Sequence, residues 1–228
     1  MAEATGIGKS AAQRFSHTLQ DLGFLKKDSD TKRYVLTPKV LELGFRYIYA
    51  DPLIGYAEPY LADLHMRTKE SVNLWRPNGN DMICVIRFPG ARQLVAPISL
   101  GQRLPMYSSS VGRAYLSSLP SAEAYNLLNT SNFEARLPTT ITDPEEIWRL
   151  VQQARIDGYA SAFQQFHPTD LAFGAPIVDA SGKGIGAINI SVPSTRWREK
   201  KAMETFPALI LETARAISAN LRDHLEVI

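Results

Sequence analysis

The chain has 228 residues, of which 45% are hydrophobic and 21% charged, and its formal net charge is +2. This length suits one large domain or two small ones, and the composition excludes disordered, collagen-like and disulfide-rich proteins. No apolar run approaches the roughly 20 residues that span a bilayer. The first residues lack the basic and apolar regions of a signal peptide, so we expect a cytoplasmic protein with no membrane partner.

Basic residues are concentrated in the first 40 residues, where seven lysines and arginines stand against four acidic residues, a net charge of +3. The remainder of the chain therefore carries −1. An amphipathic helix is predicted over 8–22, ended by Gly23. Two β-type runs, 24–25 and 34–36, flank a charged turn and predict a hairpin with a basic tip.

Helices and strands alternate beyond this basic head. Thr37-Pro38 is typical of a helix start and predicts a helix over 38–50, and a second follows from 52 to about 67, with a domain boundary near 44–52. Strand pairs interspersed with helices predict an α+β fold built on an antiparallel sheet. The further strands are expected at 71–76, 82–88, 93–98, 172–178 and 184–192, and the further helices at 105–119, 121–129, 144–156 and up to about 222.

Sequence signatures of catalysis, of metal binding and of cofactor binding are missing. The four histidines share no metal-ligand spacing, and Cys84 is the single cysteine. No nucleophile elbow or Cys–His pair occurs, and Gly8-Lys9-Ser10 lacks the first glycine of a P-loop. We therefore expect no catalytic residue, no metal and no cofactor.

The helix after Gly8 carries side chains that suit DNA. A major groove admits one helix, whose N-terminal residues reach the base edges. Arg and Lys pair with guanine, Gln with adenine, and a Ser hydroxyl bonds a phosphate, while a basic hairpin tip meets flanking phosphates. The alternative is a solvated basic helix in a generic three-helix unit. The predicted DNA-binding residues are Lys9, Ser10, Ala11, Gln13, Arg14, Lys32 and Arg33.

Beginning with Thr-Gly-Ile-Gly-Lys-Ser at 5–10, the chain resembles the IclR family of bacterial transcriptional regulators. The matching stretches are 5–15, 22–25, 33–44, 100–116, 157–159, 175–179 and 188–193. The resemblance implies a partial winged helix-turn-helix over 1–37, a linker helix over 38–51 and a GAF-like effector-binding domain with an antiparallel sheet over 52–228. It also implies homodimers, often paired into tetramers. Because the family's reader has further helices before this one, the resemblance predicts an incomplete reader here.

The same resemblance places an effector pocket over the sheet, roofed by the turn and helix start at 104–112. Residues 189 and 191 share a strand face, and an amide and a hydroxyl opposite a Ser-rich helix start suit a carboxylate. The alternative is that both side chains only hydrogen-bond within the fold. The matching effector-binding positions are Met106, Tyr107, Ser108, Ser109, Gly112, Asn189 and Ser191.

Three aromatic residues, Phe163, Phe166 and Phe173, are expected to form an apolar wall, so the predicted ligand is a small aromatic or other organic acid. Where the family often has an acidic residue and a cysteine in the pocket, this chain has Ala162 and Ala172. The effector contacts must therefore differ from the family's.

The function predicted from these features is a transcriptional regulator that binds double-stranded operator DNA under the control of the bound acid. Ligand would favour one arrangement of the effector domains, and the helix over 38–50 would shift the spacing of two readers. One alternative is a small-molecule sensor or interaction module without DNA binding, because the reader is incomplete. The other is a small-molecule enzyme whose head is a dimerisation arm.

Overall fold

The computed structural model describes residues 5–90 and 98–225, with side chains up to residue 222. The chain folds into two compact units, which we call the N-terminal unit and the C-terminal unit, divided between Pro52 and Leu53.

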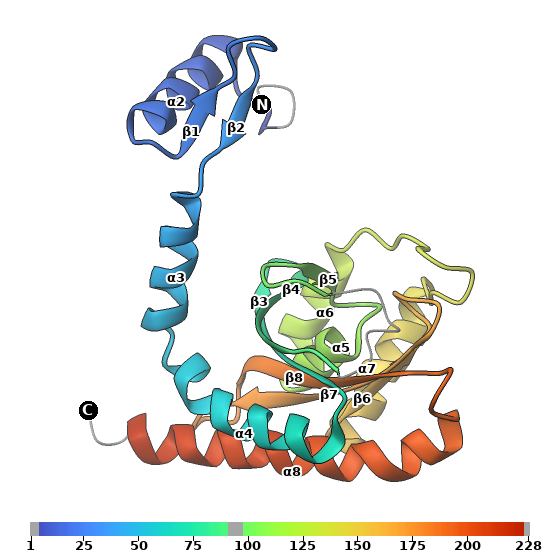
Figure 1. The fold of residues 1–228 in the computed structure, drawn as a ribbon. Helices are drawn as coiled ribbons and strands as arrows, with labels where there is room; N and C mark the ends of the chain where they lie inside the picture. The colour runs from blue at the N-terminus through green and yellow to red at the C-terminus, as the bar shows by residue number, and fades with distance from the viewer. Residues whose placement is uncertain (1–4, 91–97, 226–228) are drawn as a thin grey trace. The chain divides into compact units, whose positions relative to one another are not determined.

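The N-terminal unit begins with α2 (Lys9–Asp21), which follows Gly8 as N-cap and ends before Gly23, whose φ is +80°. Strands β1 (Leu25–Lys27) and β2 (Tyr34–Leu36) form an antiparallel hairpin, and α3 (Val40–Ala50) follows (Figure 1). A positive φ is the conformation that glycine adopts without strain. The predicted helix and hairpin are confirmed.

The start of α3 differs from the prediction, which placed Pro38 in the first turn. The Thr37 hydroxyl donates to the Gly23 carbonyl at 2.5 Å, and the Lys39 ammonium donates to the Leu22 carbonyl at 3.0 Å. Thr37 and Lys39 therefore tie the end of the hairpin back to the end of α2, and the helix begins only at Val40.

The C-terminal unit is built on a six-stranded sheet in the order β5-β4-β3-β8-β7-β6. All neighbouring strands are antiparallel, and the β3–β8 pairing joins the first hairpin to the last. The predicted antiparallel α+β fold is confirmed. The strands are β3 (Ser71–Asn78), β4 (Asp81–Phe88), β5 (Arg103–Pro105), β6 (Ala160–Phe163), β7 (Asp170–Val178) and β8 (Gly184–Pro193).

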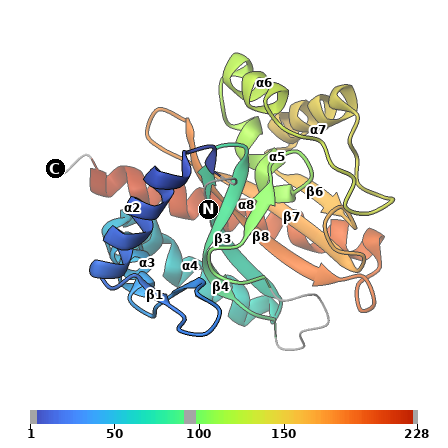
Figure 2. The same ribbon diagram turned by 90° about the horizontal axis from the view of Figure 1, so that it is seen from above.

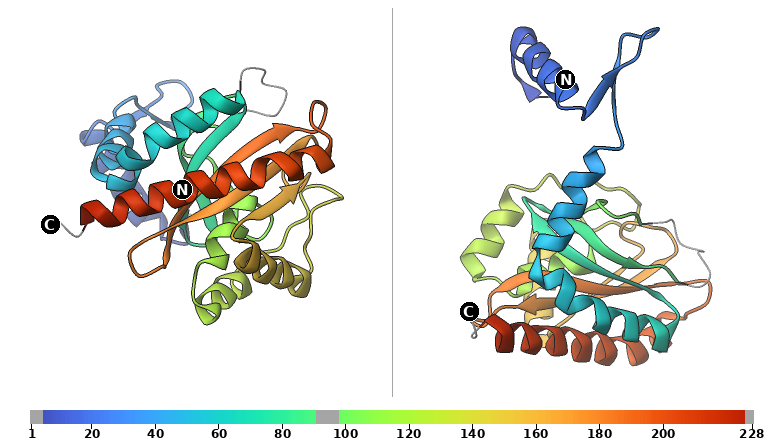
Figure 3. Two further views of the ribbon diagram at one scale, coloured as in Figure 1. Left: turned by 90° about the horizontal axis from the view of Figure 1, so that it is seen from below. Right: turned by 60° about the vertical axis from the view of Figure 1, so that its left-hand side comes forward.

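Helices cover both faces of this sheet. On one face α8 runs along the strands with α4 beside it (Figure 3), and the Asn220 amide donates to the Tyr60 hydroxyl at 2.8 Å between these two helices. The opposite face carries α5, α6 and α7 (Figures 1 and 2). The helices are α4 (Pro52–Thr68), α5 (Ser110–Ser117), α6 (Ser121–Asn129), α7 (Pro144–Asp157) and α8 (Glu199–Leu225).

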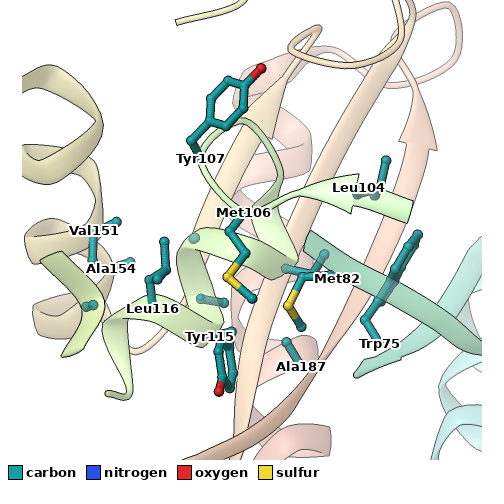
Figure 4. Packing of buried hydrophobic residues seen from close by; sticks show 14 of the residues in the cluster. Trp75, Met82, Leu104, Met106, Tyr107, Tyr115, Leu116, Val151, Ala154 and Ala187 are labelled. Atoms are coloured by element: carbon teal, nitrogen blue, oxygen red, sulfur yellow. The ribbon is translucent and has the colours of Figure 1, made fainter. Parts of the chain in front are cut away.

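Strand alternation divides the core between the two faces. Phe173 and Phe206 pack together between β7 and α8, with ring centroids 5.7 Å apart. On the α5 side, Trp75, Met82 and Met106 belong to a second buried cluster (Figure 4). Both faces of the sheet are therefore buried, as the long apolar strands require.

Three sequence predictions in this unit need correction or fall outside the description. Strands β5 and β6 were not predicted, because three and four residues give no periodic signal. The helix expected over 105–119 begins only at Ser110, because residues 106–109 form a turn. The strand expected at 93–98 lies, except for Ile98, outside the described residues.

Candidate functional site

The predicted DNA-binding residues of α2 form one exposed stripe. Lys9, Ser10, Gln13 and Arg14 are exposed and lie three or four positions apart, which places them on one side of the helix. Ala11 lies off this stripe and is half-buried. Among the described residues, neither Lys9 nor Arg14 forms an ion pair. Both cations are therefore available to an anion.

The hairpin tip is held by the carboxylate of Asp28. Its Oδ1 accepts hydrogen bonds from the Thr31 backbone N–H at 2.7 Å and the Thr31 hydroxyl at 2.8 Å, and these bonds lower the pKa of Asp28. Lys32 has φ +58° and, like Arg33, is exposed. The turn, held by the hydrogen bonds of Asp28, thus presents two cations at the end of the hairpin.

The C-terminal unit has a pocket on the α5 face of the sheet, between the start of α5, the strands β7 and β8 and the segment after β6. Its empty volume is about 410 Å³, part of which is open to solvent. The lining residues are Ile98, Leu104, Ser108, Ser109, Ser110, Ala162, Gln165, Phe166, His167, Asp170, Ala172 and Asn189.

Two glycines allow the start of α5 to pack tightly at this pocket. A Cβ on Gly112 would lie 2.1 Å from the Cα of Met106, and one on Gly174 would lie 2.7 Å from the carbonyl carbon of Ser110. The Ser109 hydroxyl caps the helix, accepting from the Gly112 N–H at 3.1 Å and donating to the Pro105 carbonyl at 2.7 Å. The helix start is therefore seated directly on β7.

A buried hydroxyl without a partner lies in the pocket wall. Ser108 is 1% exposed, and its Oγ has no hydrogen-bond partner among the described residues. A buried polar group without a partner costs free energy. Ser108 is therefore the group in this wall that a bound polar ligand would satisfy.

A buried arginine lies behind this wall. Arg113 is 2% exposed, and its guanidinium donates to the carbonyl of Tyr107 at 2.7 Å and to the side-chain oxygen of Gln165 at 3.3 Å. Burial lowers its pKa to about 10, so it remains a cation at neutral pH. No described carboxylate forms an ion pair with it. This charge makes the pocket attractive to an anion.

The orientation of the Asn189 amide follows from its neighbours. Its Oδ1 accepts from the Trp75 indole N–H at 2.8 Å and from the Asn73 amide at 3.0 Å. The indole can only donate, and Asn73 itself accepts from the Arg87 guanidinium at 3.3 Å. Asn189 therefore keeps its oxygen toward these donors and has its NH₂ group to offer to a ligand. We call Ser108, Ser109 and Asn189 the serine end of the pocket.

The pocket wall also contains a carboxyl group. Asp170 accepts a hydrogen bond from the Ser191 hydroxyl, and burial raises the pKa of Asp170 to about 6, against the opposing effect of that bond. His167 also lines the pocket, and burial lowers its pKa. Among the described residues no cation forms an ion pair with Asp170.

Four of the predicted effector-binding residues do not line the pocket. Met106 and Tyr107 both belong to the buried core cluster, which also contains Met82 (Figure 4), and the Tyr107 ring packs edge-to-face on Phe133 with centroids 5.2 Å apart. The Tyr107 hydroxyl donates to the Glu134 carbonyl at 2.7 Å. Gly112 packs on Met106, and the Ser191 hydroxyl donates to the Asp170 carboxyl group. The predicted lining positions found in the pocket wall are Ser108, Ser109 and Asn189.

The expected aromatic wall is reduced to Phe166. Phe163 and Phe173 contact each other with ring centroids 5.4 Å apart, and Phe173 packs against α8, so this part of the prediction was wrong. Because Ala162 and Ala172 face the pocket, strand alternation turns their neighbours to the other face. Residues missed by the sequence interpretation include Gln165, His167 and Asp170.

Two further searches bear on the kind of site. No group of three or more His, Cys, Asp or Glu side chains suited to a metal occurs within the described part of the chain. None of the helices in that part is long and apolar enough to cross a membrane.

Comparisons with known proteins agree on one family. The family model described as the C-terminal part of the bacterial transcriptional regulator IclR matches residues 45–219. The Pca regulon regulatory protein of Pseudomonas putida is 31% identical over 222 residues, which are 97% of this chain and 76% of that protein. The HTH-type transcriptional regulator KdgR of Escherichia coli is 26% identical, over 98% of this chain and 85% of that protein.

A solved structure gives the same result for the fold. The crystal structure of Thermotoga maritima IclR superposes with a TM-score of 0.77 at 27% identity, and the match covers 96% of this chain and 88% of that one. These relatives are named as regulators and not as enzymes.

Proposed function

Because the chain belongs to the IclR family of bacterial transcriptional regulators, we propose that it binds operator DNA in the cytoplasm under the control of a small organic acid. In this proposal residues 1–37 are the DNA reader, 38–51 the linker and 52–228 the effector domain. The observation that carries the proposal is the buried Ser108 hydroxyl, which has no hydrogen-bond partner among the described residues and lies in a pocket near the buried Arg113. The N-terminal unit of the same chain exposes cations that form no ion pair among those residues.

The DNA contact rests on the stripe of α2 and the hairpin tip. Lys9 and Arg14 offer their charges to phosphates or guanines, and Gln13 suits an adenine. Lys32 and Arg33 lie on a separate element and supply flanking phosphate contacts, as a wing does. Ser10 is exposed on α2 next to Lys9 and serves as a phosphate donor.

The effector contact rests on the serine end of the pocket. A ligand carboxylate would accept hydrogen bonds from the Ser108 hydroxyl and from the Asn189 NH₂ group. Neither group donates to an acceptor in the hydrogen bonds of the described residues. The buried guanidinium of Arg113 favours an anion over a neutral ligand, and Phe166 supplies an apolar surface for the ligand's carbon skeleton.

We further propose that the protein is a homodimer or a tetramer of such dimers. Helix α3 has no buried residue. Its apolar side chains lie on every side except that of Glu42 and Arg46, and such a surface is normally covered. A second copy would cover this surface and would also present two readers to two operator half-sites. The exposed apolar side chains of α3 are Leu41, Leu43, Phe45, Tyr47 and Tyr49.

Binding to DNA is tested with a labelled duplex from upstream of the protein's own gene and a scrambled duplex of the same composition. Fluorescence anisotropy is measured between 50 and 200 mM salt, a range over which phosphate contacts weaken steeply. We expect preference for the native duplex, and Arg14→Ala should cost about 1–3 kcal/mol of binding free energy. The control is Arg198→Ala, an exposed arginine of the C-terminal unit, which should bind as the wild type does.

Equal retention of the two duplexes, or an unchanged affinity of Arg14→Ala, would contradict the DNA proposal. Organic acids added to the same assay test effector control, which requires at least one acid to change the DNA affinity.

The oligomeric state is tested by sedimentation velocity. Leu41→Glu and Phe45→Glu together should shift the protein toward monomer, because two charges then lie on the proposed interface. Ile156→Glu is the control, since Ile156 on α7 is also highly exposed and lies in the other unit. A monomeric wild type would contradict this part of the proposal.

A further inference from the structure

Residues 164–169 join β6 to β7 and form part of the pocket wall, and we call them the gate turn. Gln165, Phe166 and His167 of this turn line the pocket. Most of the other lining residues belong to strands of the sheet or to the start of α5. A movement of the gate turn would therefore change access to the pocket without a movement of the sheet.

The gate turn begins with a strained residue. Gln164 has a φ of +54°, a left-handed conformation that costs free energy for a residue with a side chain. Its N–H donates to the Asp170 carbonyl at 2.7 Å, and its carbonyl accepts from the Thr139 hydroxyl. Strain of this kind persists where surrounding contacts hold the residue in place. The strain at Gln164 is therefore released when these contacts break.

A second segment, residues 136–141 between α6 and α7, holds the gate turn, and we call it the strap. The Thr140 hydroxyl donates to the Gln165 carbonyl at 2.7 Å. The Gln165 side chain donates to the Thr139 carbonyl and accepts from the Ile141 N–H, both at 2.8 Å. The backbone and the side-chain amide of Gln165 are thus both bonded to the strap.

The contacts between the strap and the gate turn lie partly at the surface. The Arg136 guanidinium lies over the Phe166 ring, 4.5 Å from its centroid, and Arg136 and Thr139 are exposed. Water can replace an exposed hydrogen bond or ring contact, whereas it cannot enter the packed core. Segments held in this way open at a lower free energy than the core strands do.

We propose that the gate turn opens and closes as a unit over the pocket, that the strap keeps it closed, and that the strain at Gln164 lowers the free energy of opening. Opening gives a ligand access to the wall that contains the buried Ser108, and closing excludes water from that wall. The gate goes beyond the proposed function, because it concerns access to the pocket and not the ligand that the pocket binds.

Amide hydrogen exchange of the full chain without ligand, followed by NMR, tests whether the gate turn opens as a unit. The reporters are the amides of Gln164, Asp170 and Ile141, whose hydrogen bonds lie within or next to the gate turn or join it to the strap. We expect one free energy of opening for all three amides, with a weaker dependence on urea than that of the β7 and β8 amides. Exchange of the three amides only by global unfolding would overturn the proposal.

Two variants should shift the opening in opposite directions. Thr139→Val keeps the branched shape and removes the hydrogen bond to Gln164, so the three amides should exchange about fivefold faster. Gln164→Asn introduces a residue that adopts the left-handed conformation more readily, so the same amides should exchange about threefold more slowly. Thr205→Val is the matched control, because the Thr205 hydroxyl also donates to a backbone carbonyl, on α8. It should leave the three amides unchanged.

Labelling of a thiol in the pocket tests whether the gate turn controls access. Ser108→Cys places a thiol in the buried wall, and the wild type, whose Cys84 is 1% exposed, is the blank. Iodoacetamide is used at concentrations at which the labelling rate follows the opening equilibrium. We expect labelling of Ser108→Cys to become about fivefold faster when Thr139→Val is added and about threefold slower when Gln164→Asn is added.

The opposite effects of the two variants distinguish a gate from general destabilisation, which would speed exchange in both. Faster exchange in Gln164→Asn, or unchanged exchange in Thr139→Val, would overturn the roles of the strain and of the strap. If labelling does not follow exchange, the turn moves without controlling access, and the gate is wrong. No ligand and no DNA enter these measurements, so their failure leaves the proposed function intact, and failure of acid or DNA binding leaves the gate intact.

Discussion

In the N-terminal unit, the buried residues among those described are Ala12, Ser16 and Leu25, whereas the C-terminal unit buries side chains on both faces of a six-stranded sheet. The polar groups follow the same division. The cations of α2 and of the hairpin are exposed, and the polar groups of the pocket are buried around Ser108 and Arg113.

Exposed and buried polar groups suit different kinds of binding partner. An exposed cation costs nothing to keep in water and binds another charged surface by contact, which suits a macromolecule. A buried hydroxyl or guanidinium has lost its water and gains only from a ligand that enters the pocket. In the proposed function, this division separates a contact surface from a receptor within one chain.

The largest expected contrast is between two phenylalanines. Phe206 is 1% exposed and packs on Phe173 and Trp197, while Phe15 on α2 is 59% exposed. Phe206→Ala should lower the free energy of unfolding by about 3–5 kcal/mol, and Phe15→Ala by less than about 1 kcal/mol. Urea unfolding followed by circular dichroism measures both. A cost for Phe15→Ala as large as that for Phe206→Ala would mean that the Phe15 ring is covered in the protein, and the contrast would be wrong.

Elements with local signals were predicted closely from the sequence. Helix α7 is the clearest case, because the Asp143 side chain accepts from the Glu145 N–H at its start and Gly158 has φ +79° at its end. The hairpins were predicted for the same reason, since turn residues and alternation lie within a few positions of each other.

Features that depend on distant residues were not predicted. Strand β7 was expected from Ala172, but pairing with β8 extends it back to Asp170, and this extension brings the carboxyl group into the pocket. The sequence interpretation assigned Phe173 to the pocket. Its neighbour Ala172 lines the pocket, so strand alternation turns the Phe173 side chain to the other face of the sheet. The environment of Gln165 depends on Arg113, 52 residues away, and no local pattern indicates it.

Two aspartates, one in each unit, respond to pH in opposite directions. The pKa of Asp170 is raised to about 6 from an ordinary value of 3.8, so between about pH 4 and 6 the folded chain binds more protons than the unfolded chain. Stability contributed by Asp170 is therefore present below pH 4 and lost as the pH rises to 6, by up to about 3 kcal/mol. Hydrogen bonds lower the pKa of Asp28, so its contribution is present above its ordinary pKa and lost as the pH falls.

Urea unfolding of the wild type, Asp170→Asn and Asp28→Asn from pH 4 to 7 measures these responses, because differences between variant and wild type cancel the other titrations. The stability difference between Asp170→Asn and the wild type should increase with pH in favour of the variant. The difference for Asp28→Asn should instead be nearly constant above about pH 5, because the contribution of Asp28 is lost only as the pH falls through its ordinary pKa of 3.8. Parallel curves for Asp170→Asn and the wild type would show that Asp170 is not buried as described.

Two hydrogen-bonded pairs of an acidic and a basic side chain give the smallest expected contrast. Glu70 is 3% exposed, accepts from the Trp197 indole N–H at 2.6 Å and pairs with Arg196. In the N-terminal unit, Asp21 pairs with His17 at 2.7 Å with both side chains mostly exposed.

Glu70→Gln should lower the free energy of unfolding by about 2 kcal/mol, since it leaves a half-buried guanidinium without its anion. Asp21→Asn should lower it by about 0.5 kcal/mol or less, because water screens the exposed pair. The same urea measurement, repeated in 1 M salt, should shrink the effect of Asp21→Asn and leave that of Glu70→Gln nearly unchanged, because salt screens exposed charges far more than buried ones. If the two variants were equally sensitive to salt, Glu70 would be in contact with solvent. The contrast between exposed polar groups in the N-terminal unit and buried ones in the C-terminal unit would then be wrong for Glu70.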